Sequence, residues 1–149
     1  MTPGSWVNHM LGPDAMTEHL PQGSTSSLGF ARFNPSRMEE IAEQAGSHAI
    51  VYELVGLFLG DVEARVRDLA TTVQNDDDAA RERVSHSIKG SCANLGAERM
   101  AELARIIEHC PAAAAPDLLA KIQEEFAALK LVLHETYPES APNDPTAPR

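Results

Sequence analysis

The chain has 149 residues, of which 43% are hydrophobic and 23% charged, so it is long enough for one domain with a substantial core. Its formal net charge of −10 is unfavourable for binding a nucleic-acid backbone or an anionic membrane surface. The N-terminus has no basic region followed by an apolar run, and no apolar stretch approaches the roughly 18 residues of a membrane span. We therefore expect a cytoplasmic protein without a signal peptide or a membrane-spanning helix.

The prolines separate two terminal segments from the rest of the chain. Residues 1–33 are rich in glycine, serine, threonine and proline and show no periodicity, which predicts a flexible N-terminal arm. Residues 138–149 are predicted to form a flexible C-terminal tail, which leaves 34–137 as the folded domain. Trp6 and Leu11 could dock the arm, but the sequence does not indicate where.

The folded domain begins with two predicted helices. The first is short, over about 36–45, and ends at Gly46, after which Ser47 is a candidate N-cap for the second. The second helix is long, because apolar residues recur every three or four positions over about six turns. This stripe consists of Val51, Val55, Phe58, Val62, Val66, Leu69 and Val73. Gly56 and Gly60 lie inside the helix and could permit a close helix contact or a slight bend.

The acidic segment 75–78 interrupts the helical pattern. We interpret it as a turn followed by an N-cap, with aspartates favoured by the helix dipole. The alternative is a calcium loop, but the glycine and terminal glutamate of an EF-hand are missing. Three more helices are predicted, with Gly96 after the first and Pro111 and Pro116 around the last connection: 78–95, 97–110 and 116–136.

Low aromatic content, 5% of the chain, favours helix packing over a β-sandwich. Four amphipathic helices joined by short connections bury their apolar stripes best as an antiparallel bundle. The predicted fold is therefore all-α, an up-down-up-down four-helix bundle with the short helix 36–45 as an additional N-terminal element.

A helical wheel of residues 84–95 separates a core face from an outer face. Val84, Ile88, Ser91 and Leu95 fall within about 60° of one another and form the predicted core face. His86 points to nearly the opposite side.

Small residues surround His86 on this predicted outer face. Gly90 and Ala93 lie beside it, and Lys89 lies on its flank. A glycine inside a helix costs roughly 1 kcal/mol relative to alanine, so Gly90 is explained best if a large partner must approach His86. A neutral imidazole is a competent nucleophile near neutral pH, and a lysine three residues later can stabilise an attached phosphoryl group. The alternative is an ordinary surface histidine.

These residues resemble a known family. The sequence Ser-His-Ser-Ile-Lys-Gly-Ser-Cys-Ala-Asn-Leu-Gly-Ala at 85–97 is similar to the signature of histidine-containing phosphotransfer (HPt) domains. That signature combines a histidine, an apolar residue, Lys-Gly, a small residue and a downstream Leu-Gly-Ala at fixed spacing. The resemblance extends over about 36–137 and includes Leu-Phe-Leu-Gly-Asp at 57–61.

The resemblance implies a phosphoryl carrier in a two-component multistep phosphorelay. His86 would accept a phosphoryl group from the phospho-aspartate of one receiver domain and pass it to an aspartate of a second. The implied partners are the receiver domains of hybrid sensor kinases and response regulators. Lys89 would neutralise the phosphoryl group, Gly90 would admit the partner, and Ser91 with 95–96 would set the packing of the helix. The receiver domain would supply Mg²⁺, so no cofactor or resident metal is expected in this chain. The resemblance also implies a monomer without kinase or ATPase activity.

A carboxylate on the following helix is a further candidate. Some family members place Gln or Glu there, and counting along the chain gives Glu108, which could orient the imidazole but would repel the phosphoryl group. The alternative is a solvated charge. His109 is explained by its place in the last turn of a helix.

Other readings of the chain stay open. The cysteines Cys92 and Cys110 are expected to be small apolar fillers, with a regulatory disulfide as the alternative. No H-x₃-H, HExxH or CxxC spacing points to zinc. Rival functions are a receiver-docking module without phosphotransfer, a metal-dependent helical enzyme and a fragment of a hybrid kinase.

Overall fold

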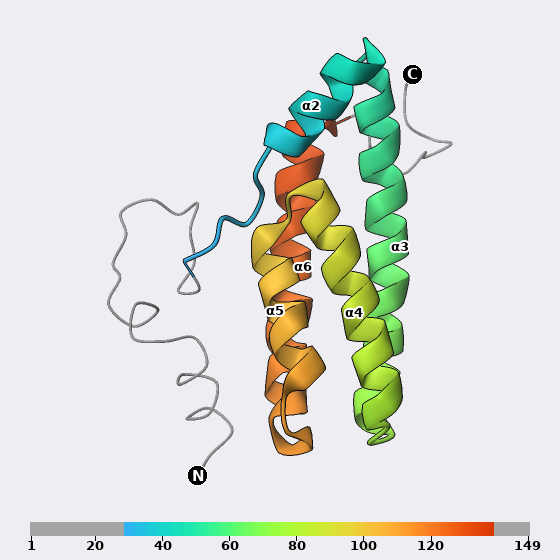
Figure 1. Cartoon of the computed structure of the whole chain (residues 1–149), viewed down its shortest axis with the longest axis vertical. Helices are drawn as coiled ribbons and strands as arrows, with labels where there is room; N and C mark the ends of the chain where they lie inside the picture. The colour runs from blue at the N-terminus through green and yellow to red at the C-terminus, as the bar shows by residue number, and fades with distance from the viewer. Residues whose placement is uncertain (1–28, 139–149) are drawn as a thin grey trace.

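The computed structural model of the protein describes residues 29–138, which are mostly helical (Figure 1). Along the chain the elements are α2 (Ser36–Ala45), α3 (Ala49–Gln74), α4 (Asp78–Leu95), α5 (Glu98–His109), the short 3₁₀ helix η2 (Ala112–Ala114) and α6 (Ala115–Thr136). Most of the predicted arm, with Trp6 and Leu11, lies outside the described residues, as do residues 139–149 of the predicted tail.

The four longest helices form a bundle. Helix α4 packs against α3 and α5, and α6 closes the arrangement by packing against the same two helices. Helices α3 and α6 extend beyond the α4–α5 connection, and α2 lies across this extension against α3 (Figure 1). The all-α, up-down-up-down four-helix bundle with a short additional N-terminal helix is therefore confirmed.

The ends of the helices are encoded locally. Gly46 ends α2 in the left-handed conformation, with φ of 70°. The Ser47 hydroxyl accepts a hydrogen bond from the backbone N–H of Ala49 at 3.1 Å, at the start of α3. A carboxylate oxygen of Asp77 accepts from the N–H of Ala80 at 3.1 Å and caps α4, which confirms the turn-and-cap interpretation of residues 75–78.

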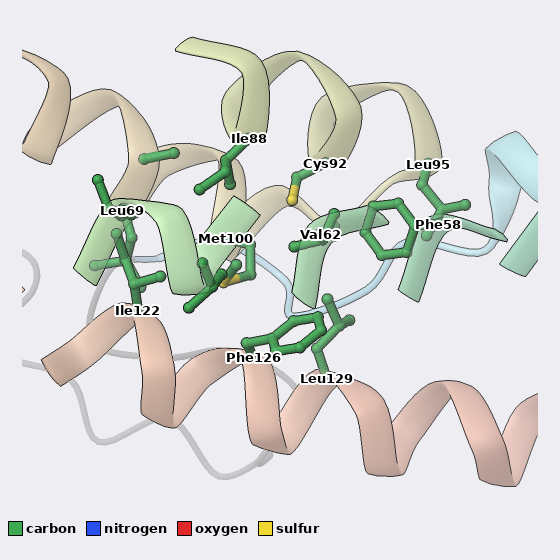
Figure 2. Close-up of a cluster of buried hydrophobic side chains, with 14 of the residues drawn as sticks. Phe58, Val62, Leu69, Ile88, Cys92, Leu95, Met100, Ile122, Phe126 and Leu129 are labelled. Carbon is green, nitrogen blue, oxygen red and sulfur yellow. The ribbon is translucent and has the colours of Figure 1, made fainter. Parts of the chain in front are cut away.

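The core lies between all four bundle helices (Figure 2). The predicted stripe of α3 is buried from Val51 to Leu69, and Val73 is half-buried at its end.

Cys92 and Cys110 are free and buried, so they act as apolar fillers and form no disulfide. Burial, with a smaller contribution from Asp61, raises the pKa of the Cys92 thiol to about 12. That thiol is therefore protonated and unreactive at neutral pH.

The α4–α5 turn requires the glycine of the sequence signature. Gly96 has a φ of 98°, and a Cβ at this position would collide with the backbone carbonyl of Asn34. The N–H of Asn34 donates to the carbonyl of Gly96 at 2.8 Å, so the segment before α2 lies directly against this turn. Only glycine combines the left-handed conformation with so close a contact.

Residues 29–33 pack against the bundle, although the sequence assigned them to the flexible arm. Arg32 donates to Glu125 of α6 at 2.8 Å, and the backbone N–H of Arg99 donates to the carbonyl of Ala31 at 3.1 Å. The side chains of Arg99 and Glu125 are almost fully buried, and buried charges need such partners. Arg32 and Glu125 are 93 residues apart in the sequence, so no local pattern predicts their contact, and residues 29–33 lie against the bundle.

Candidate functional site

The buried face of α4 is turned relative to the wheel prediction. Ile88 and Leu95 are buried as expected, but their buried neighbours are Ser85 and Cys92, whereas Val84 and Ser91 are only half-buried. The shift corresponds to about 50° on the wheel. Helix α4 makes its most extensive contacts with α5, and this packing turns the helix toward that neighbour.

This rotation leaves His86 exposed and brings Lys89 to α5. The His86 side chain is 68% exposed, and Gly90 and Ala93 are exposed on the same side of α4. Lys89 is half-buried, with 31% of its side chain exposed, because it lies at the edge of α4 that meets α5. The sequence wheel placed Lys89 on the flank of His86 without indicating that it contacts another helix.

Glu108 of α5 joins the two residues into one cluster. One carboxylate oxygen, Oε2, lies 3.2 Å from Nδ1 of His86, and the other, Oε1, lies 3.1 Å from Nζ of Lys89. The Glu108 side chain is only 7% exposed, so it is a buried carboxylate and not the solvated charge that the sequence left as the alternative. The tertiary structure thus brings together His86, Lys89 and Glu108.

Glu108 is ionised at neutral pH. Burial by itself raises the pKa of this carboxyl, but Lys89, the His86 ring and His109 together outweigh burial and hold the pKa below its usual value. His109 takes part because its Nε2 lies 3.8 Å from Oε1 of Glu108. From the sequence, we explained His109 by the helix dipole alone. Its position next to the candidate Glu108 could have predicted the contact between the two side chains.

The ionised carboxylate fixes the tautomer of His86. A carboxylate without a proton only accepts hydrogen bonds, so the His86 nitrogen that faces it, Nδ1, carries the ring proton. In a neutral imidazole the other nitrogen, Nε2, then has a free lone pair. The cluster therefore presents an exposed ring with a defined nucleophilic atom.

Gly90 is exposed on the same side of α4 as His86 and has no side chain that could cover the ring. A Cβ added at Gly90 would have no heavy atom within 4 Å, so nothing in the described part of the chain requires a glycine there.

Within residues 29–138, no three histidine, cysteine, aspartate or glutamate side chains gather where they could hold a metal ion. Over the same range, no helix has the length and apolar character needed to cross a bilayer.

Comparison with known proteins identifies a solved structure with a similar fold. The crystal structure of histidine-containing phosphotransfer protein B (HptB) from Pseudomonas aeruginosa PAO1 is similar to this chain, with a TM-score of 0.66 and 24% sequence identity. The similarity covers 72% of this chain and 95% of that one, and it shows a common fold. No curated protein matches the sequence.

A family model covers the centre of the bundle. The model of the Hpt domain matches residues 53–131, from α3 to α6, which is more than half of the chain. That range contains the whole of α4 and α5, and so the complete cluster around His86. The chain therefore belongs to the Hpt domain family, whose proteins carry out histidine phosphotransfer in phosphorelays.

Proposed function

We propose that His86 is the phosphoryl carrier, and that it relays the group from the phospho-aspartate of one receiver domain to an aspartate of a second. The observation that supports this most directly is the exposed His86 ring, whose Nδ1 faces the buried Glu108 carboxylate at 3.2 Å. This contact leaves Nε2 free to react, on a helix that the bundle holds rigidly.

In the first transfer, the lone pair of Nε2 attacks the phosphorus atom and the bond from phosphorus to the aspartyl oxygen breaks. The aspartate leaves as a carboxylate, and the proton on Nδ1 stays on the ring and donates to Glu108. In the second transfer, the aspartate of the other receiver attacks phosphorus and Nε2 regains its lone pair. The receiver domains would supply Mg²⁺ for both steps, so no step needs ATP or a cofactor bound to this chain.

Lys89 and Glu108 act in opposite directions on the phosphorylated ring. The Lys89 ammonium, 3.1 Å from Glu108, lies close enough to the ring to turn toward a phosphoryl group that carries about two negative charges. Glu108 repels that group but stabilises the charged ring through Nδ1. The balance keeps phosphohistidine from becoming too stable to pass its group on.

The exposed side of α4 also has room for a receiver domain. An open groove of about 340 Å³ lies where α4 meets α2 and α3, and Leu57 at its edge is 66% exposed. Exposed Gly90 lies on the same helix as the groove residues Ser91 and Asn94. A receiver domain seated on this groove would bring its reactive aspartate toward His86 past Gly90, which has no side chain to obstruct the approach.

Transfer from a phosphorylated receiver domain tests the proposal. With Mg²⁺ and a receiver labelled on its aspartate, we expect label on the wild-type chain and none on His86→Gln. His48→Gln is the matched control, because His48 is an exposed histidine just before α3, and this variant should be labelled like the wild type. ATP alone should label none of the three proteins.

Two results would contradict the assignment. Label that persists in His86→Gln would place the phosphoryl group elsewhere. A wild-type chain that binds the receiver but is never labelled would support the docking module without phosphotransfer.

A further inference from the structure

A second groove lies on the other side of the exposed face of α4. Its volume is about 300 Å³, and α4 contributes Lys89 and Ala93 while α5 contributes Ala101 and Arg105. Phe30, from the segment before α2, lines the same groove and is 40% exposed. An exposed phenylalanine beside small apolar residues indicates a surface with room for another large side chain.

The segment that enters this groove is held firmly. The carbonyl of Phe30 accepts a hydrogen bond from Nε of Arg99 at 3.2 Å, and Arg32 forms an ion pair with Glu125 at 2.8 Å. These contacts fix the position of Gly29, from which the rest of the N-terminal segment must start. Gly29, to which residues 1–28 are joined, therefore lies directly next to Phe30 of the groove in sequence.

Residues 1–28 contain a side chain that fits the groove chemically. Trp6 is the single tryptophan of the chain, and residues 1–28 include no lysine or arginine. An indole packs well against a phenylalanine ring and binds cations on its face better than other aromatic side chains. The groove offers both, because the ring of Phe30 and the cations of Lys89 and Arg105 line it. Glu98 and Glu102 line it as well, and each cation is paired with a carboxylate, Lys89 with Glu108 and Arg105 with Glu102.

We propose that Trp6 docks in the groove formed by Phe30, Lys89, Ala93, Ala101 and Arg105, and that the N-terminal segment thereby competes with partners for the His86 face. The proposal gives a docking site to Trp6 of the predicted N-terminal arm. The competition depends on the proposed function, whereas the docking of Trp6 does not.

The length of the segment is sufficient for this contact. Trp6 and Gly29 are separated by about 23 residues, and a random coil of that length would have a typical end-to-end distance of ~25 Å. Tethering at such lengths gives an effective concentration in the millimolar range. A contact with a dissociation constant of about 1 mM would thus be occupied much of the time and would weaken partner binding about two- to tenfold.

Tryptophan fluorescence of the full chain tests the docking directly, because the emission comes from Trp6 alone. We expect blue-shifted emission and protection from acrylamide in the wild type. Phe30→Ser and, independently, Ala93→Glu should shift the emission to that of a solvated indole. Leu131→Ser is the matched control, since Leu131 is an exposed apolar residue of α6 outside the groove, and it should leave the emission unchanged.

Emission typical of a solvated indole in the wild type, or no response to both groove variants, would overturn the docking. Trp6→Ser should raise the rate of phosphotransfer from a receiver at subsaturating concentration about two- to tenfold. An unchanged rate with protected Trp6 would overturn the competition. If no variant, including the wild type, is ever labelled, the proposed function fails while the fluorescence result stands.

Discussion

The middle of α4 and its C-terminal turn each contain a glycine, and the two glycines meet opposite surroundings. A Cβ at Gly96 would collide with the carbonyl of Asn34 in a left-handed turn, whereas a Cβ at Gly90 would meet nothing within 4 Å. The chain itself requires the first glycine, and nothing described in the chain requires the second. One short sequence signature therefore combines a residue for folding with a residue that we assign to partner access.

The largest effect on stability is expected at the turn. Gly96→Ala introduces a side chain at a φ of 98° and against the Asn34 backbone, so the free energy of unfolding should fall by about 2 kcal/mol or more. Urea denaturation followed by circular dichroism measures this loss. A variant as stable as the wild type would show that the segment before α2 does not press on the turn.

Lys89→Ala tests whether the ammonium group of Lys89 stabilises the phosphoryl group. Loss of a charged partner for the phosphoryl group is worth about 1.5 kcal/mol or more, which corresponds to about tenfold slower transfer or shorter phosphohistidine lifetime. The helix content should stay unchanged, because Lys89 lies at the edge of the core. Unchanged transfer and lifetime would remove the proposed role.

Gly90→Ala sharpens the contrast between the glycines because its two effects should have opposite signs. Alanine in place of this open glycine should stabilise the helix by about 0.5 to 1 kcal/mol. The added methyl group should weaken the approach of a receiver domain and slow transfer by roughly fivefold, or about 1 kcal/mol. Faster transfer in this variant would contradict the access role.

The smallest effect concerns pH and Glu108. Because the folded pKa of this carboxyl lies below its ordinary value of 4.5, its pairing stabilises the protein fully above that value. The stabilisation is lost as the pH falls through the lower folded pKa. Glu108→Gln should thus be less stable than the wild type near pH 7, and the gap should narrow on acidification. A gap that does not change with pH would show that the charge of Glu108 is not what stabilises the cluster.

The signature of α4 predicted that His86 and Gly90 of the candidate site lie on an outer face of the helix. His86 is exposed and Gly90 is open, as the spacing along one helix indicated. The wheel was less accurate for Lys89, because the rotation of α4 depends on how it packs against α5. Glu108 could be proposed only from the resemblance to HPt domains together with counting along the chain. Its burial against His86 and Lys89 became visible only in the tertiary structure.

The sequence by itself determined where most helices begin and end, since a left-handed glycine at Gly46 or an N-cap at Asp77 acts within a few residues. It also determined that four apolar stripes must be buried together. Only the tertiary structure decided which charges meet, as in the pairs Arg32–Glu125 and Lys89–Glu108. It also decided why residue 96 must be glycine, because a Cβ there would collide with the carbonyl oxygen of Asn34, which belongs to the segment before α2. Such contacts join residues far apart in the chain, so no local pattern records them.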